Sequence, residues 1–161
     1  MIEVFIEKQQ IEKAKEQRDL MPKELKNSIR HGEGTLIGKL GEQVIAKYLG
    51  IELPKDTYNY DMTYKNKKIE VKTKETTVPY VKSYYECSIS NANPNQKCDY
   101  YAFLRILNDH SKAWICGFIS KEDFFKKATY HKKGELDDSN NFTFKWDCYN
   151  LPYRELEMTI K

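Results

Sequence analysis

Two acids and a lysine, Asp61, Glu70 and Lys72, are spaced so that extended backbone would bring their side chains together. Mg²⁺ takes oxygen ligands and is commonly held by one or two carboxylates together with water and substrate phosphate. The carbonyl of Val71 lies between Glu70 and Lys72 and could add a ligand. A bound metal lowers the pKa of an attacking water, which the lysine could orient or deprotonate. The pattern therefore predicts a Mg²⁺ (or Mn²⁺) site, with Asp61, Glu70 and Val71 as ligands, that hydrolyses a phosphodiester.

The segment 58–75 predicts the β-hairpin that would assemble this site. Its side chains alternate, and KNKK supplies a polar turn, which we place at Asn66 and Lys67. The face expected to pack on a core consists of Met62, Tyr64, Ile69 and Val71. The other face consists of the cross-strand pairs Asp61–Lys72 and Thr63–Glu70. Cross-strand neighbours lie about 5 Å apart, so the acids and the lysine would share one small area.

The same charge alternation is also found on ordinary exposed hairpins, where a salt bridge has no further role. A charged surface hairpin is thus the alternative to a catalytic site. Residues 65–82 hold six lysines against two glutamates, and such a run is often only a solvated face. Beside a hydrolytic site, the lysines would instead hold phosphates on either side of the cut. The residues expected to do so are Lys65, Lys67, Lys68 and Lys74.

A helix predicted over 37–49 precedes the hairpin. At about 100° per residue its apolar side chains fall on one broad arc, and Gly50 follows as a stop signal. Glu42 sits at the margin of the arc, between the buried and the solvated side. Gly38 and Gly41 cost helix stability, which indicates that another backbone approaches the helix closely.

The remaining pattern predicts a mixed fold of helices and strands, α/β in the broad sense and more narrowly α+β. An edge strand is expected at 1–6, a peripheral helix at 8–19, a short helix from Pro22 to Ile29 and a loop at 30–34. Strands are expected at 80–90, 100–106, 112–119 and 142–149, with loops at 90–97 (or a short helix there) and 134–141. Ser120 and Asp123 form a capping box that opens a helix over 121–128.

The order of these motifs resembles the core of the PD-(D/E)XK nuclease superfamily, which includes restriction endonucleases, archaeal-type Holliday-junction resolvases and phage exonucleases. The resemblance covers roughly residues 36–128 and rests on GKLGEQVIAKYL (38–49), YD (60–61), IEVKTK (69–74) and CDYYAFLRI (98–106). It implies a restriction-endonuclease-like core, a central mixed β-sheet flanked by helices. Residues 1–35 would be an N-terminal helical extension, and residues 129–161 a C-terminal loop and strand.

The resemblance also implies catalytic roles. Glu42, Asp61, Glu70 and Lys72 match, in order, the helix glutamate, the strand aspartate and the E-x-K of the family. Tyr60 stands where the motif has its proline. The implied function is Mg²⁺-dependent hydrolysis of DNA by metal-activated water, as a structure-specific or restriction-type endonuclease. The alternative is a catalytically inactive DNA-binding or assembly module on the same fold.

Bulk composition adds little about partners. The net charge is +3, and four cysteines are spread singly, which argues against a zinc site built from close pairs and favours free thiols in a reducing cytoplasm. Neither a leader segment nor an apolar run long enough for a membrane is expected. His31, His110 and His131 are expected to be isolated and exposed. A homodimer would suit cleavage of both strands of a duplex.

Overall fold

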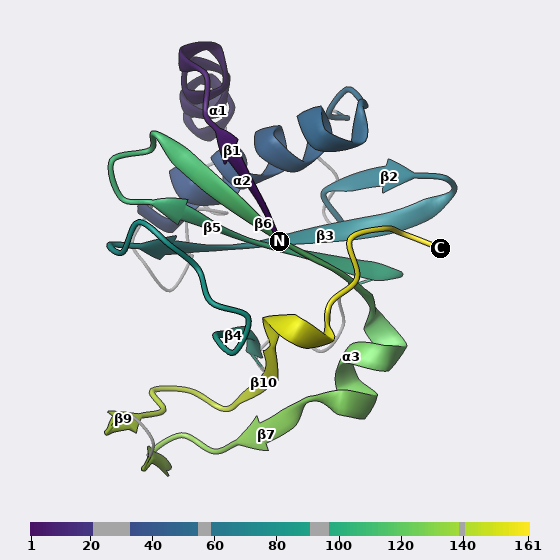
Figure 1. Cartoon of the computed structure of the whole chain (residues 1–161). Coiled ribbons are helices and arrows are strands. Elements are labelled where there is room, and N and C mark those ends of the chain that lie inside the picture. Colours follow the sequence, from purple (N-terminus) through teal and green to yellow (C-terminus); the bar gives the residue numbers. More distant parts are fainter. Residues whose placement is uncertain (21–32, 55–58, 91–96, 139–140) are drawn as a thin grey trace.

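A twisted mixed sheet forms the centre of the computed structural model, which describes residues 1–20, 33–54, 59–90, 97–138 and 141–161 (Figure 1). The strands lie in the order β1 (Ile2–Phe5), β6 (Lys112–Ser120), β5 (Tyr100–Leu107), β3 (Lys67–Thr76) and β2 (Met62–Tyr64). β5 and β3 are parallel, and the other neighbours in this sheet are antiparallel. The expected mixed α+β fold is confirmed at this level.

The two faces of the sheet are covered differently (Figure 1). On one face lie α1 (Lys8–Leu20) and α2 (Glu33–Leu49). The opposite face carries α3 (Lys121–Lys127) and a small antiparallel sheet of β4 (Glu86–Ser90), β10 (Cys148–Pro152) and β7 (Thr129–His131). Outside these layers are the two-residue strands β8 (Leu136–Asp137) and β9 (Phe142–Thr143), and a 3-10 turn at Tyr153–Glu155.

Side chains that alternate along β5 contribute to two hydrophobic cores, one on each face of the central sheet. Ala102, Leu104 and Ile106 belong to the core under the helices α1 and α2. Tyr101 and Phe103 belong to the second core, with Phe124 of α3. Because successive side chains of a strand point to opposite faces, a strand buried on both faces reads as the continuous apolar run seen in the sequence.

Contacts of α2 with β3 account for one of the two glycines that the sequence singled out. A Cβ added to Gly41 would overlap the side-chain oxygen of Thr73, so the glycine lets helix and strand approach closely. The partner is thus a side chain rather than a backbone. Gly38 has open space around its Cβ position, so the expected close approach there is wrong.

The first hairpin forms with a register two residues away from the expected one. Met62 pairs with Ile69 and Tyr64 with Lys67, so the turn is Lys65-Asn66 rather than Asn66-Lys67. Both turn residues have positive φ, 48° and 61°, as a two-residue type I′ turn requires. A shift by two residues preserves the faces of both strands, and only the cross-strand partners change.

Several element boundaries also differ from expectation. α2 begins at Glu33 instead of Ile37, because Leu36 extends its packed face toward the N-terminus. Only residues 86–90 of the expected strand 80–90 are extended in a sheet, since Lys82 and Tyr85 close a turn (3.0 Å). The expected strand 142–149 is split into β9 and β10, where Phe144 instead bonds to the backbone at 134–135. The predicted helix from Pro22 to Ile29 lies outside the described residues.

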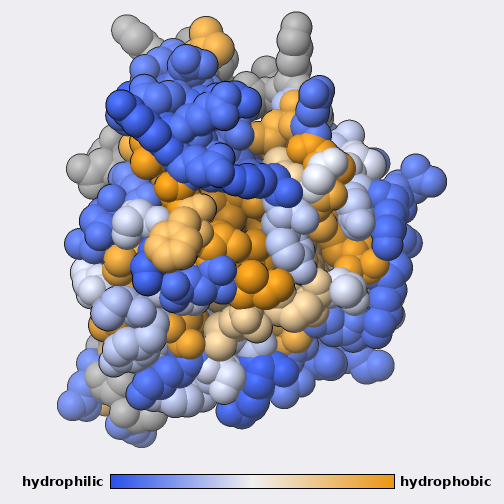
Figure 2. Space-filling view, turned by 45° about the horizontal axis from the view of Figure 1, so that its top comes forward, coloured by the Kyte–Doolittle hydropathy of each residue, from blue (hydrophilic) through white to orange (hydrophobic). Residues whose placement is uncertain are grey.

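The N-terminal segment is part of the fold rather than only an extension, because β1 forms the edge of the central sheet. Next to it, α1 presents an almost wholly hydrophilic ridge that borders an apolar area of the surface (Figure 2). Among the described residues, none of the helices is both long and apolar enough to cross a membrane.

Candidate active site

Asp61 lies where β3 loses its antiparallel neighbour. β2 pairs only with residues 67–69, and the amide of Asp61 adds a last bond to the carbonyl of Ile69 (2.9 Å). At the next position the side chain of Asp61 replaces the missing backbone partner, since Asp61 Oδ2 accepts the backbone N–H of Val71 at 2.7 Å. The N–H and C=O of one strand residue point to the same side. The Val71 carbonyl therefore faces the Asp61 side of β3 as well.

Glu70 and Lys72 project from the same face of β3 and form an ion pair, with 2.8 Å between Glu70 Oε1 and Lys72 Nζ. The glutamate side chain is 13% exposed and the lysine side chain 31%, so the pair is partly shielded from water. The expected cross-strand pairs Asp61–Lys72 and Thr63–Glu70 are wrong because of the register. Thr63 pairs with Lys68 and is exposed.

Glu42 comes from α2 and forms an ion pair with Lys39 one turn earlier, at 3.1 Å. Both side chains are only 11–12% exposed. This position agrees with the margin of the apolar arc on which the sequence placed Glu42. The paired charges lie at the contact between helix and sheet rather than in open solvent.

Electrostatic coupling shows that the three acids share one neighbourhood. The pKa of Asp61 is raised to about 8, first by burial of its carboxyl group and then by the negative charges of Glu42 and Glu70. The N–H of Val71 and the ammonium group of Lys72 act in the opposite direction but do not compensate. Glu42, Glu70 and Lys72 therefore all act on the Asp61 carboxyl group, although the four residues expected to be catalytic come from three separate segments.

This neighbourhood fits a divalent cation in charge and in ligand type. Carboxylate and carbonyl oxygens are the ligands that Mg²⁺ and Mn²⁺ prefer, and excess negative charge around a buried acid is what a cation would relieve. Among the described residues, however, no three His, Cys, Asp or Glu side chains already form a compact metal-binding group. In this state Glu70 and Glu42 are turned toward their lysine partners.

The four lysines expected to bind phosphate fall into two groups. Lys65, Lys67 and Lys68 are exposed around the β2–β3 turn, with Lys65 over the ring of Tyr64. Lys74 lies on the face of Glu70 and Lys72, and its ammonium group donates to Ser88 Oγ of β4 at 3.0 Å. Lys74 thus lies beside the candidate catalytic residues, while the other three lysines surround the turn of the hairpin.

A pocket of about 210 Å³ separates this face of β3 from β4. It is lined by Lys72, Thr73, Lys74, Cys87, Ser88, Phe103, Leu104 and Tyr153. Sequence reasoning missed both β4 as a wall and Arg105, whose Nε donates to Tyr153 Oη at 2.8 Å beside the pocket. A signal for Arg105 was present, because it is the one charge in the apolar strand YYAFLRI.

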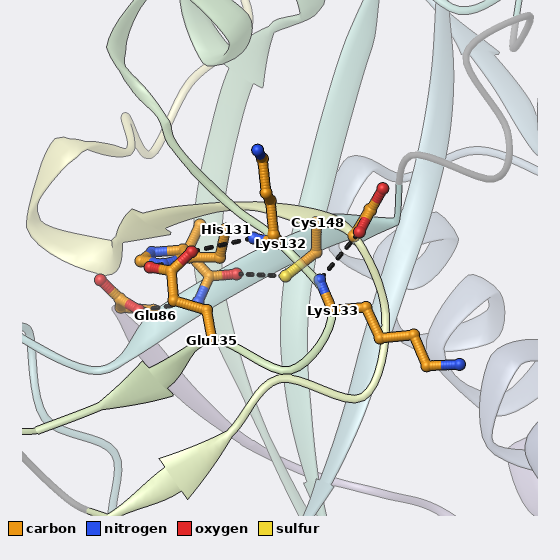
Figure 3. A network of polar contacts seen from close by, with 8 residues as sticks. Glu86, His131, Lys132, Lys133, Glu135 and Cys148 are labelled. Atoms are coloured by element: carbon orange, nitrogen blue, oxygen red, sulfur yellow. Dashed lines mark hydrogen bonds and ion pairs between the residues drawn. The ribbon is translucent and has the colours of Figure 1, made fainter.

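Polar contacts hold the small sheet that forms this wall (Figure 3). Asn150 donates to Glu86 at 2.9 Å and so ties β10 to β4. On β7, His131 contacts Glu135 at 2.7 Å and stacks on Phe144, so the prediction of an isolated, exposed histidine is wrong at this position. The wall is therefore a supported part of the fold.

No protein-family model matches this chain, and no curated protein matches it. What the protein does is therefore inferred from the chemistry of the site.

Proposed function

We propose that this protein is a Mg²⁺- or Mn²⁺-dependent deoxyribonuclease with a restriction-endonuclease-like core of the PD-(D/E)XK type. The observation that carries the proposal is the shared neighbourhood of Glu42, Asp61, Glu70 and Lys72 at the open edge of β3. The arrangement of a helix on the sheet, an antiparallel hairpin and a following parallel strand supports it. The acids alone would fit many metal sites, but the lysine beside them favours phosphodiester hydrolysis.

Each residue has a distinct part in this chemistry. A divalent cation held by Asp61, Glu70 and the Val71 carbonyl would supply a more acidic water and neutralise charge on the phosphate. The N–H of Val71 fixes the Asp61 carboxylate at the strand edge. Lys72 can position a water or a phosphate oxygen once substrate competes for its contact with Glu70. Glu42 adds negative charge from the helix side.

The test is cleavage of labelled linear, nicked and branched DNAs with Mg²⁺, and with EDTA as the control. Asp61→Ala and Lys72→Ala should each abolish cleavage and leave the unfolding temperature near that of the wild type. For Asp61, the lost bond to Val71 costs about 1 kcal/mol, and the removal of repulsion offsets it. Glu75→Ala, an exposed acid on the same strand, should cleave normally. Normal cleavage by both active-site variants would refute the assignment.

An inactive DNA-binding or assembly module is the second candidate. Two observations favour it: Glu42 and Glu70 are each ion-paired with a lysine, and the described residues contain no preformed metal group. Such a module would bind the same DNAs with or without Mg²⁺ and leave all of them intact. The cleavage assay therefore separates the two candidates directly.

The expected oligomeric state depends on whether the protein cleaves one or both strands of a duplex. Cleavage of both strands of a duplex calls for two sites, and a twofold dimer is the commonest way to supply them. We propose a homodimer for that case, which sedimentation velocity of the purified protein would test. A sharp single species at monomer mass with both strands cut at once would contradict it.

A further inference from the structure

An unbroken series of ring and cation contacts leads from the buried Tyr153, which lines the pocket beside the candidate active site, to exposed tyrosines at the surface. Its members, here called the tyrosine strip, are Tyr80, Lys82, Tyr84, Tyr85, Arg105 and Tyr153. Lys82 lies over the rings of both Tyr80 and Tyr84, 5.4 Å from each centroid. The rings of Tyr84 and Tyr85 meet edge to face at 5.2 Å.

Arg105 connects these residues to the body of the protein. Its guanidinium group lies 5.3 Å from the ring centroid of Tyr85 and 5.5 Å from that of Tyr153. The same side chain bonds to the Tyr153 hydroxyl. The outer rings of the strip remain open, because Tyr80 is 47% exposed and Tyr84 is 55% exposed.

The strip is held in place rather than carried on a loose loop. The amide of Tyr85 donates to the carbonyl of Lys82 (3.0 Å), closing a turn. That turn is fastened to the chain after β10 by two backbone bonds, Tyr153 N to Tyr85 O at 2.8 Å and Arg154 N to Ser83 O at 2.9 Å. Large exposed rings on a fixed backbone lose little entropy on binding, as a stacking platform requires.

Positive charge continues from the strip to the candidate catalytic residues. Arg105 is the neighbour of Lys74 across the parallel strands, and Lys74 lines the pocket together with Lys72 and Tyr153. Desolvation by the surrounding side chains, and then repulsion from Arg105, lower the pKa of Lys74, although part of the residue is exposed. Two cations that repel one another at a pocket are well placed to receive a phosphate.

We propose that the tyrosine strip binds an unpaired segment of DNA, with bases stacked on Tyr80 and Tyr84 and phosphates along Lys82, Arg105 and Lys74. Proteins that bind single strands combine base-stacking rings with a cationic track, and a duplex hides the base faces that such rings require. The inference rests on the proposed nuclease function, for which it names the substrate class: DNA with a single-stranded branch, flap or end.

The test is binding measured in EDTA, where no cleavage can occur, by fluorescence anisotropy of a labelled oligothymidylate. Tyr80→Ala/Tyr84→Ala should weaken binding about a hundredfold, at about tenfold for each stacked base. Tyr80→Phe/Tyr84→Phe keeps the rings and should bind like the wild type. Phe5→Ala is the matched control, since Phe5 is an exposed ring with Lys112 over it at 5.2 Å, on the edge strand β1 and outside the tyrosine strip.

Further arms of the experiment address charge and ligand. Lys82→Gln should lower the slope of log affinity against log salt by about 0.7, the loss of one phosphate contact to a single strand. A blunt duplex should bind more weakly than the oligothymidylate. Equal binding of the duplex, an unchanged double alanine variant, or tighter binding of an oligouridylate would each overturn the proposal.

These outcomes are distinct from failure of the nuclease assignment. Strong single-strand binding that depends on the rings, without Mg²⁺-dependent cleavage of any branched DNA, would remove the proposed catalysis and leave the strip as a binding surface. Cleavage that needs Asp61 but is unaffected by Tyr80→Ala/Tyr84→Ala would retain the catalysis and reject the strip.

Discussion

Asp61 is half-buried, and the fold disfavours the negative charge of its carboxyl group. Burial and the carboxylates of Glu42 and Glu70 raise its pKa to about 8 from the ordinary 3.8. The folded state therefore binds the Asp61 proton more tightly than the unfolded state does. This penalty on stability is absent below about pH 4, grows as the pH rises, and is complete above about pH 8. A residue held under such conditions is typical of a functional position.

Asp61→Asn should therefore raise the free energy of unfolding in EDTA, by an amount that increases from pH 5 to pH 9. The amide oxygen of asparagine can still accept the Val71 N–H, so only the charge is removed. Denaturant unfolding at the two pH values measures the difference. Asp99→Asn is the control, because Asp99 is an exposed carboxylate that likewise accepts a backbone N–H, from Lys68. A gain that is the same at both pH values would contradict the account.

At the scale of elements, the contact between α2 and β3 determines how Glu42 approaches the strand edge. Gly41→Ala would place a methyl group onto Thr73, which should cost about 1–3 kcal/mol and shift the helix. Gly38→Ala, in the same helix but with open space around it, should stabilise by about 1 kcal/mol from helix propensity. Equilibrium unfolding of the two variants gives opposite signs if the packing is as described. If both variants changed the free energy of unfolding in the same direction, the described packing of α2 on β3 would be contradicted.

The turn of the first hairpin offers a second test at this scale. Lys65 and Asn66 both have positive φ, for which Asn-Gly is the preferred pair. Lys65→Asn/Asn66→Gly should therefore stabilise the protein by about 1 kcal/mol, because the left-handed conformation costs most other residues roughly 1–2 kcal/mol each and the extra freedom of glycine in the unfolded chain offsets part of the gain. Thermal unfolding measures the gain. A turn at Asn66-Lys67, which the sequence favoured, would instead place the new asparagine outside the turn and give no gain.

Local patterns were enough to predict which residues of β3 share a face, because the side-chain period of a strand survives a two-residue change of register. They were also enough for the Ser120 cap of α3, where the hydroxyl accepts the amide of Asp123. They could not place β4 opposite Lys74, since that wall depends on pairing with β10 some sixty residues later. Arg105 was missed for the same reason: its partners Tyr85 and Tyr153 are distant in sequence.

For the molecule as a whole, the sheet has a packed core on each face, and the candidate site lies where the edge of β3 gives access from the side. α2 and β3 contribute acids to it from different layers of the fold. A cation held by Asp61, Glu70 and the Val71 carbonyl would join two segments of the chain and so stabilise the folded state, because the unfolded chain does not bring those ligands together.

Mg²⁺ or Mn²⁺ should therefore raise the unfolding temperature of the wild type, reversibly with EDTA. At about a hundred times the dissociation constant the gain is about 2.7 kcal/mol, which for a chain of this size is about 5–10 °C. Asp61→Asn should lose most of this shift, since it removes a charged ligand. Lys72→Ala should keep it, because the lysine is expected to act on water and phosphate and not on the metal. Equal shifts in the wild type and Asp61→Asn would mean that the ion binds elsewhere, whatever the nuclease assays show.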